Sequence, residues 1–241
     1  DDSASMVYVR NKSKACNEVG IEFEEFLLPE KTTMDELLNL IIDLNLRKDI
    51  HGILLQSPIP KHLNIEKAFE TIDSKKDVDG FSTINVGKLA LDKPTFISCT
   101  PHGVIKLLEE YNIKLEGTNA VILGRSNIVG KPLLQCLLRK NATVTICHSK
   151  TKNIESITKN ADILISAIGK PKFITANMIK EGSVVIDIGI NRTEDGIVGD
   201  VDFEDVVNKA SYITPVPGGV GPMTIAMLLH YVVKAAKELE K

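Results

Sequence analysis

Apolar residues along the chain fall into two alternating patterns, one with helical spacing and one of short continuous runs. In the second half, the continuous runs are typical of strands that are buried on both faces of a parallel sheet. They cover residues 120–123, 142–147, 162–167 and 184–188. Because helical patterns lie between these runs, this half is predicted to be α/β with a parallel sheet.

The first half is predicted to alternate in the same way. Residues 5–19 have helical spacing and end at Gly20, a residue type that tolerates the left-handed turn beyond a helix. A strand is then predicted at 21–28. Residues 51–56, HGILLQ, predict a second short strand, which the prolines that follow would end.

Helix-start signals mark further elements and a domain boundary. Thr33 and Glu36 have the spacing of a capping box and predict a helix between the two strands of the first half. Thr100 and Pro101 predict another helix, with Thr as the N-cap and Pro at the first helical position. We therefore expect a boundary near residues 92–101.

A second boundary is expected near residues 215–222. The first domain is then predicted to cover residues 1–100 and the second residues 101–222. The last segment, 223–241, has a helical apolar face and is expected to return to the first domain and complete it.

Composition excludes several classes of function. The 29 Lys and Arg against 32 Asp and Glu leave a net charge of −3, so no global positive field would hold nucleic acid or an anionic membrane. No apolar run approaches the roughly 18 residues of a membrane span. The four cysteines form no C-x-x-C pair, which favours reduced, buried thiols in a cytoplasmic protein without a metal site.

Residues 120–132, AVILGRSNIVGKP, combine a strand, a turn with glycines and a helix start. In dinucleotide-binding folds, backbone N–H groups at such a helix start face the cofactor pyrophosphate. The segment departs from the usual G-x-G-x-x-G pattern, because Ser126 replaces the second glycine and the last is Gly130. A strand–turn–helix connection without a ligand is the alternative interpretation.

The end of the second strand predicts the cofactor. NAD-specific folds place Asp or Glu there to hold the ribose hydroxyls, whereas this chain has CHSKT at 147–151. With Arg125, Ser149 and Lys150 available to a 2′-phosphate, NADP is favoured over NAD. The alternative is that Lys150 is a solvated loop charge.

Three other stretches offer a backbone that a ligand can approach. Gly169 and residues 189–191 follow later strands, although glycine is common at strand ends. Residues 214–224, TPVPGGVGPMT, hold three glycines and three prolines. This rigid backbone suits close approach to a ligand or an interdomain hinge.

The first domain offers fewer clear signals. Tyr8 and Lys12 share a helix face, but a lone lysine on a helix is usually a solvated charge. Gln56 ends a predicted strand, where open α/β sheets present ligand-binding residues, and a side-chain amide that caps the loop is an equal alternative. Asp79 lies in KKDVDG, which is typical of a turn and could direct a carboxylate towards a ligand.

Taken together, these motifs resemble those of the bifunctional methylenetetrahydrofolate dehydrogenase/cyclohydrolase family over essentially the whole chain. YVRNK looks like the family's Y-x-x-x-K motif, HGILLQSP its G-x-L-V-Q-L-P strand and KDVDG its folate-contacting loop. GRSNIVGKP, CHSKT, DIGIN and PVPGGVGPMT follow in the family's order.

The resemblance implies a role for each motif. Lys12 would be the catalytic base and acid, Gln56 would position it, and Tyr8 would stack on the folate. The implied substrate-binding residues are Ser5, Tyr8, Lys12, Gln56, Pro58, Asp79, Gly218, Gly219, Val220, Gly221, Pro222, Met223 and Thr224. The implied cofactor-binding residues are Gly124, Arg125, Ser126, Ser149 and Ile190.

The resemblance also implies two α/β domains with a cleft between them. The first, 1–100 with 223–241, would be the folate-binding catalytic domain, and the second, 101–222, a Rossmann-like NADP-binding domain. The expected enzyme oxidises 5,10-methylenetetrahydrofolate with NADP and hydrolyses the methenyl product to 10-formyltetrahydrofolate. It would be a cytoplasmic homodimer of one-carbon metabolism and purine biosynthesis.

Two departures accompany the resemblance. Ser57 stands where the family has Leu, and the family has a helix and a strand before DDSAS, so a preceding segment is expected to be missing from this sequence. Three alternatives are a monofunctional dehydrogenase of the same family, a shikimate-type NADP-dependent dehydrogenase and a non-enzymatic NADP-sensing module. The shikimate-type enzyme would not need both the Tyr8–Lys12 pair and PVPGGVGPMT, and the sensing module would bind the cofactor without folate-dependent turnover.

Overall fold

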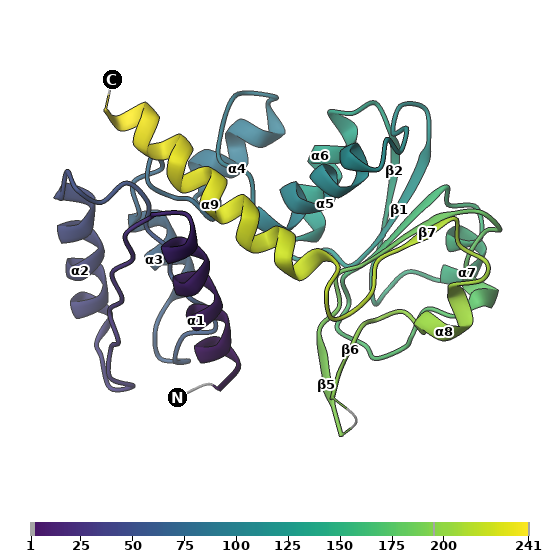
Figure 1. Cartoon of the computed structure of the whole chain (residues 1–241), viewed down its shortest axis with the longest axis horizontal. Helices are drawn as coiled ribbons and strands as arrows, with labels where there is room; N and C mark the ends of the chain where they lie inside the picture. Colours follow the sequence, from purple (N-terminus) through teal and green to yellow (C-terminus); the bar gives the residue numbers. More distant parts are fainter. Residues whose placement is uncertain (1–2, 195, 241) are drawn as a thin grey trace. The chain divides into compact units, whose positions relative to one another are not determined.

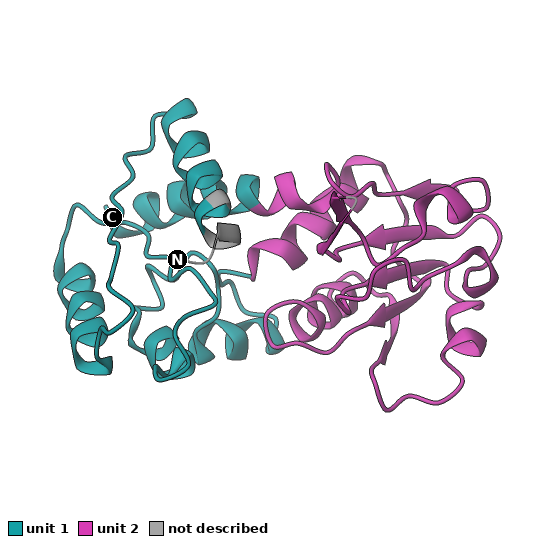
Figure 2. Cartoon of the chain, turned by 90° about the horizontal axis from the view of Figure 1, so that it is seen from below, with its two compact units in different colours: residues 1–97, 225–241 teal, residues 98–224 magenta. Residues whose placement is uncertain are grey.

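The computed structural model of the chain describes residues 3–194 and 196–240 and divides into two compact units (Figure 2). Unit 1 comprises Asp1–Ile97 and Ile225–Lys241, and unit 2 comprises Ser98–Thr224. Helix α9, Val220–Leu239, begins in unit 2 and ends in unit 1 (Figure 1).

Unit 1 is helical. Besides the larger part of α9, its helices are α1 (Ser3–Glu18), α2 (Met34–Leu46), α3 (Ile65–Thr71) and α4 (Thr83–Ala90). The predicted capping box is confirmed: Oγ1 of Thr33 accepts from the Glu36 N–H at 3.2 Å, and Oε2 of Glu36 accepts from the Thr33 N–H at 2.8 Å. Gly20, with φ +76°, follows α1 as predicted.

Among the described residues of unit 1, apolar side chains pack together in a buried cluster and in an aromatic pair. The cluster joins α2 and α3 through the buried side chains Leu37, Ile41, Ile53, Ala68 and Ile72. In the aromatic pair, the rings of Phe96 and Tyr231 pack edge to face with their centroids 5.4 Å apart. The Tyr231 hydroxyl also accepts a hydrogen bond from the Ile97 N–H at 3.1 Å, which fixes α9 on this unit.

The strands predicted at 21–28 and 51–56 are not formed, and both predictions are wrong. Within 51–56 only Ile53 pairs, through an isolated parallel bridge to Asp77. Apolar alternation can identify an extended segment, but a strand also needs a neighbour to complete its ladder of hydrogen bonds. The residues described in unit 1 do not supply such a ladder for either segment.

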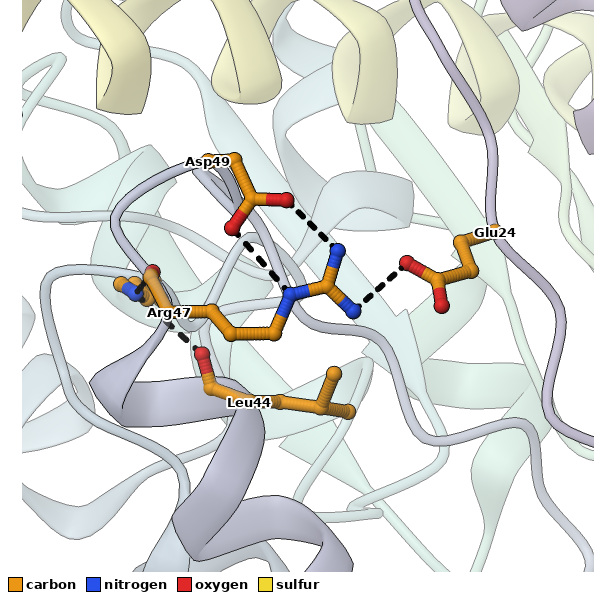
Figure 3. Close-up of polar contacts among 5 residues, drawn as sticks. Glu24, Leu44, Arg47 and Asp49 are labelled. Carbon is orange, nitrogen blue, oxygen red and sulfur yellow. Dashed lines mark hydrogen bonds and ion pairs between the residues drawn. The ribbon is translucent and has the colours of Figure 1, made fainter.

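An ion-pair cluster holds the extended segment 21–28 instead (Figure 3). Arg47, which caps the end of α2, donates through Nε and Nη2 to the two carboxylate oxygens of Asp49 at 3.1 and 2.6 Å. Its Nη1 lies 2.8 Å from Oε2 of Glu24. The guanidinium therefore links the segment to the loop after α2.

Unit 2 is built on a five-stranded parallel sheet with the order β2-β1-β3-β4-β7. Its strands are β1 (Asn119–Leu123), β2 (Thr143–Cys147), β3 (Ile163–Ser166), β4 (Val184–Asp187) and β7 (Tyr212–Ile213). The four predicted strands are confirmed to within one residue at each end. A small antiparallel hairpin joins β5 (Asn191–Thr193) to β6 (Gly196–Val198).

Helices cover both faces of this sheet (Figure 1). They are α5 (Cys99–Glu110), α6 (Gly130–Leu138), α7 (Ile154–Thr158), the 3-10 turn η1 (Ala176–Met178) and α8 (Phe203–Val206). On one face, buried Val121, Leu164 and Val185 pack against Met178 and Val206. On the other, α6 contacts β1 and β2, and α5 packs on α6.

Helix α5 begins earlier than predicted. Its N-cap is Ser98 rather than Thr100, and the Ser98 hydroxyl donates to the carbonyl of Ile128 instead of accepting from its own helix. Thr100 lies inside α5, and its Oγ1 is 3.0 Å from Oγ1 of Thr224. Hydrogen bonds to other segments thus occupy the hydroxyl of Thr100, which the sequence assigned to capping, and that of Ser98, which is the actual N-cap.

All four cysteine thiols are buried, and none forms a disulfide. Among residues 3–194 and 196–240, no helix is long and apolar enough to cross a membrane. The same residues contain no cluster of three or more His, Cys, Asp or Glu side chains placed to hold a metal ion.

Candidate active site

The side chains of Lys12 and Gln56 meet in unit 1. Lys12 lies one turn after Tyr8 on α1, and its Nζ donates to Oε1 of Gln56 at 3.0 Å, across 44 positions of sequence. Both side chains are half-buried, and the Tyr8 ring is 36% exposed. The lysine is therefore held at a defined place, with an accessible aromatic ring on the same helix face.

The loop after Gln56 fixes the orientation of its amide. Nε2 donates to the Ser57 carbonyl at 2.8 Å, so the amide oxygen must face Lys12. The amide therefore caps its loop, which is one of the two interpretations of Gln56 drawn from the sequence, and it also binds Lys12. The Ser57–Pro58 peptide bond is cis, and Pro58 is exposed beside this loop.

Asp79 is half-buried in a loop that Asp77 shapes. The Asp77 carboxylate, 2% exposed, accepts from the N–H groups of Gly80, Phe81 and Ser82 at 2.8 to 3.2 Å. Nδ2 of Asn85 also donates to it, at 2.8 Å. The loop is thus folded around a buried charge that is fully surrounded by donors, as a buried carboxylate requires.

Lys76 anchors the same loop to the end of α2. Its ammonium is buried and donates to the carbonyls of Leu44, Asn45 and Arg47 at 3.3, 2.8 and 2.6 Å. Burial lowers the pKa of Lys76 below the ordinary lysine value. The carbonyl of Lys76 in turn accepts from the Ile53 N–H at 2.7 Å, which ties the loop to the segment that carries Gln56.

The carboxyl edge of the unit 2 sheet has the features of a dinucleotide site. The strand order reverses between β1 and β3, and open α/β sheets bind ligands at such a switch point. Gly124 follows β1 with φ +110°, and any Cβ there would collide with the Ala167 carbonyl after β3. A Cβ on Gly130, at the start of α6, would collide with the Gly124 backbone.

The turn before α6 fits the pyrophosphate of a dinucleotide. Residues 125–128 are exposed there, directly before the positive end of a nine-residue helix. Oγ of Ser126 accepts from the N–H groups of Val129 and Gly130 at 3.1 and 3.4 Å. Ser126 thus replaces the second glycine of the usual pattern by capping the helix, while its own O–H remains a donor for a phosphate.

The remaining predicted cofactor residues lie on loops at the same edge. Arg125 follows β1, Ser149 and Lys150 follow β2, and Ile190 follows β4. Arg125, Ser149 and Lys150 are exposed, and Ile190 is 48% exposed. The structure therefore brings these residues to the carboxyl edge of one parallel sheet, after β2, β1 and β4.

The segment 214–224 combines a tight turn with a helix start. Gly218 has φ +105°, and a Cβ on Gly219 would lie 2.5 Å from the Pro215 carbonyl. Helix α9 begins at Val220, three residues before the predicted start, so Gly221, Pro222, Met223 and Thr224 form its first turn. Ser5 lies in α1, but its side chain is outside the described part of the structure.

Two profiles of known families match this chain. The profile described as the tetrahydrofolate dehydrogenase/cyclohydrolase NAD(P)-binding domain matches residues 98–240, and that of the catalytic domain matches residues 1–79. The chain is also 58% identical over 238 residues to the bifunctional protein FolD of Campylobacter concisus, covering 98% of this chain and 84% of that protein. The chain belongs to the tetrahydrofolate dehydrogenase/cyclohydrolase family.

Solved structures of the family share this fold. The bifunctional FolD enzyme of Campylobacter jejuni aligns with a TM-score of 0.98 and 54% identity, covering 99% of this chain and 85% of that one. The methylenetetrahydrofolate dehydrogenase-cyclohydrolase of Trypanosoma brucei, complexed with NADP and an inhibitor, aligns with a TM-score of 0.93 and 36% identity. That match covers 98% of this chain and 83% of the other.

Sequence reasoning missed the buried charges around both sites of this family member. Besides Lys76 and Asp77, they include Asp187 and Asp200, which are 3% and 0% exposed at the carboxyl edge of the unit 2 sheet. Burial raises the pKa of Asp187. Flanking glycines were the available signal, since a Cβ on Gly189 would collide with the Asp200 carboxylate and one on Gly199 with that of Asp187.

Proposed function

We propose that this chain oxidises 5,10-methylenetetrahydrofolate to 5,10-methenyltetrahydrofolate with NADP, and hydrolyses the methenyl product to 10-formyltetrahydrofolate. The Lys12–Gln56 hydrogen bond carries the proposal, because only the hydrolysis needs a positioned proton carrier. The curated relative from C. concisus is named as bifunctional, which supports two activities over the monofunctional alternative.

In the hydrolysis, water attacks the cationic methenyl carbon and loses one proton. We assign that proton to the amine of Lys12, which then returns it to the ring nitrogen as the carbon–nitrogen bond breaks. Gln56 would direct the amine, since its oxygen accepts from Nζ while its own N–H is held by the Ser57 carbonyl. As that bond breaks, the hydroxyl left by the attacking water becomes the formyl carbonyl and its remaining proton goes to solvent, so one water is consumed and one proton is released overall.

In the oxidation, the substrate loses a hydride from its methylene bridge, so alignment rather than proton transfer is required. NADP supplies the hydride acceptor when it is bound. Gly124, Ser126 and the start of α6 would hold its pyrophosphate. Arg125 and Ser149 would meet the 2′-phosphate, and Ile190 would contact the nicotinamide.

The folate contacts proposed in unit 1 come from three places. Tyr8 would stack on the folate from α1, Asp79 would hold the pterin ring, and Pro58 would pack beside Gln56. Ser5 is proposed to lie close to Lys12. In unit 2, residues 218–224 are proposed to line the folate-binding surface, because their tight turn leaves backbone open to a ligand.

Two further features of the proposal rest on the family resemblance. The enzyme is a homodimer, and it works in the cytoplasm in one-carbon metabolism and purine biosynthesis. Light scattering on the purified protein tests the first feature, and a mass equal to one chain would refute it.

The Lys12→Met variant tests the assignment of roles. Hydrolysis of methenyltetrahydrofolate should fall at least about a hundredfold, while hydride transfer to NADP remains measurable, because a proton carrier is lost and alignment is kept. NADPH and methenyl absorbance are followed together. Gln56→Leu should also reduce hydrolysis, through a misplaced lysine.

Lys14→Met is the matched control, since Lys14 is exposed on the same helix and pairs only weakly with Glu18, at 3.8 Å. Both activities should survive in it. Equal loss of the two activities in Lys12→Met, in a folded protein that still binds folate, would refute the role of Lys12.

A further inference from the structure

Asp200 is a fully buried carboxylate at the carboxyl edge of the unit 2 sheet. It follows the β5–β6 hairpin and lies outside the residues proposed to touch folate or NADP. Because its side chain is 0% exposed, it cannot contact a bound cofactor directly. Its effect must pass through the groups that it binds.

Five donors converge on this carboxylate from two separate loops. From the end of β3 and the loop beyond it, Oδ2 accepts from the Ser166 hydroxyl at 3.0 Å and from the N–H groups of Ile168 and Gly169 at 2.7 and 3.3 Å. Oδ1 accepts from the Lys170 N–H at 2.9 Å. It also accepts from Nδ2 of Asn191, directly after Ile190, at 3.0 Å.

Asp187 fixes Asp200 to the sheet. As the last residue of β4, Asp187 accepts through Oδ1 from the N–H groups of Asp200 and Gly189 at 3.0 and 2.9 Å. Its Oδ2 accepts from the Val201 N–H at 2.8 Å. Gly189 and Gly199 leave no room for a side chain against the two carboxylates. The segment that carries Asp200 is therefore placed relative to β4 by a second buried charge.

Stability alone does not account for this arrangement. Two buried carboxylates repel each other, and a buried ionic group is often less stabilising than apolar residues of the same volume. What the pair does supply is a fixed geometry. The Asp200 carboxylate binds the last residue of β3, three consecutive backbone N–H groups at 168–170 and the side chain of the residue after Ile190. Both loops lie at the edge where the cofactor is proposed to bind.

We propose that Asp200 is a positioning residue for the dehydrogenase reaction. By binding Ser166, residues 168–170 and Asn191 at once, it sets the distance between the loop after β3 and the loop after β4, which approach the nicotinamide end of the cofactor. This inference rests on the proposed function, because it requires NADP at the carboxyl edge of the sheet. Hydrolysis of methenyltetrahydrofolate needs no cofactor and should not depend on Asp200.

Asp200→Asn is the direct test. An amide keeps the shape but places an NH₂ group against backbone N–H donors, so at least one loop must detach. Three quantities are measured: NADP affinity by calorimetry, kcat and KM for both reactions, and amide hydrogen exchange over residues 167–170 and 189–191 in the cofactor-free protein. Asp202→Asn is the matched control, two residues along the same segment and only half-buried.

In Asp200→Asn we expect NADP affinity to fall about tenfold or more and the dehydrogenase kcat to fall roughly 10- to 100-fold, because the reacting atoms are misplaced. Exchange should rise in the two loops, and hydrolysis should stay within about twofold of the wild-type rate. Asp202→Asn should leave all of these quantities unchanged. An equal fall in both activities, or unchanged NADP affinity and dehydrogenase kcat, would overturn the proposal.

Asn191→Ala provides a second test if Asp200→Asn does not fold. It releases only the loop after β4, so it should lower NADP affinity and raise exchange at 189–191 but not at 167–170. Unchanged affinity would count against the proposal. NADP affinity and amide exchange are measured without folate. If the wild-type protein showed no folate turnover, the proposed function would be refuted, and these two measurements would still test whether Asp200 positions the cofactor loops.

Discussion

Arg125 is the residue whose charge can separate NADP from NAD. It is exposed directly after Gly124, and no acidic residue occupies 147–151, the end of β2 and its loop. A guanidinium can meet a phosphate with two hydrogen bonds, and such a charge-assisted contact is worth about 1.5–3 kcal/mol. One side chain is therefore sufficient to set the preference.

Arg125→Ala should weaken NADP binding roughly ten- to a hundredfold and leave NAD binding nearly unchanged, because NAD has no 2′-phosphate. Titration of both cofactors against wild type and variant measures the ratio directly. Arg139→Ala, at the far end of α6, serves as the control. If both affinities fall by the same factor, Arg125 holds the loop or the pyrophosphate instead.

Asp49 should titrate at an unusually low pH. The hydrogen bonds from Arg47 lower the pKa of this carboxyl from 3.8 to about 2. A lowered folded-state pKa means that the contribution of the pair is complete above the ordinary value and is lost as the pH falls through about 2. The contribution is small, because the pair is solvent-exposed and screened by salt.

Carboxyl chemical shifts followed by NMR against pH should place the Asp49 midpoint lower in wild type than in Arg47→Gln, because the variant loses the cation that favours the ionised carboxylate. Arg10→Gln, an exposed arginine on α1, should leave the midpoint unchanged. Equal midpoints in wild type and Arg47→Gln would show that the guanidinium does not hold Asp49 in solution.

Single residues also show what a sequence can and cannot reveal. Lys12 and Lys76 are both lysines in helical or turn patterns, yet one binds Gln56 and the other is buried under the end of α2. From local sequence alone, each would be interpreted as a solvent-exposed charge. The groups that bind them lie 44 positions away for Lys12 and 29 positions away for Lys76, so local sequence does not reveal their burial. The family motif identified Lys12, whereas nothing local distinguished Lys76 from Lys75.

At the scale of elements, the end of α2 depends on a cation from another segment. A helix leaves its last carbonyls without partners, and here Lys76 takes those of Leu44, Asn45 and Arg47. The positive charge is also favourable at the negative end of the helix. The capping box at Thr33 secures the opposite end.

Lys76→Met should lower the free energy of unfolding by about 1–3 kcal/mol, because it leaves buried carbonyls without donors. Lys75→Met is the matched control: Lys75 is exposed next to it, and its loss should change stability by about 0.5 kcal/mol or less. Urea unfolding of the three proteins measures the difference. Equal midpoints for the two variants would mean that water replaces the lysine at the helix end.

Elements differ in how far the sequence predicts them. The four apolar runs of unit 2 became strands because each has a parallel neighbour on at least one side, so hydrophobicity and pairing agree. Residues 21–28 and 51–56 carry similar apolar content, but the described structure provides no ladder for them. The pattern of apolar residues thus predicts which segments are buried. It predicts strand pairing only where the partner strand is also present.

At the scale of the whole molecule, the residues proposed to bind the cofactor in unit 2 could be grouped from the sequence because they follow strands. Parallel strands bring their carboxyl ends to one edge, so residues 124–126, 149 and 190 could be grouped before any coordinates existed. The buried carboxylates that hold these loops could not be predicted. Asp187 and Asp200 lie on either side of the β5–β6 hairpin in the chain, and in the sequence they look like ordinary acidic loop residues. Only the glycines beside them indicate how close the chain comes.

The order of the units along the chain has a consequence for biosynthesis. Unit 2 is an insertion between Ile97 and Ile225, and it has all of its residues once Thr224 leaves the ribosome. The synthesis of unit 1 starts first, but at that point the unit still lacks Tyr231. The ring of Tyr231 packs on Phe96, and its hydroxyl accepts a hydrogen bond from the Ile97 N–H. On a nascent chain that emerges from its N-terminus, the unit synthesised first is therefore the last to close its core.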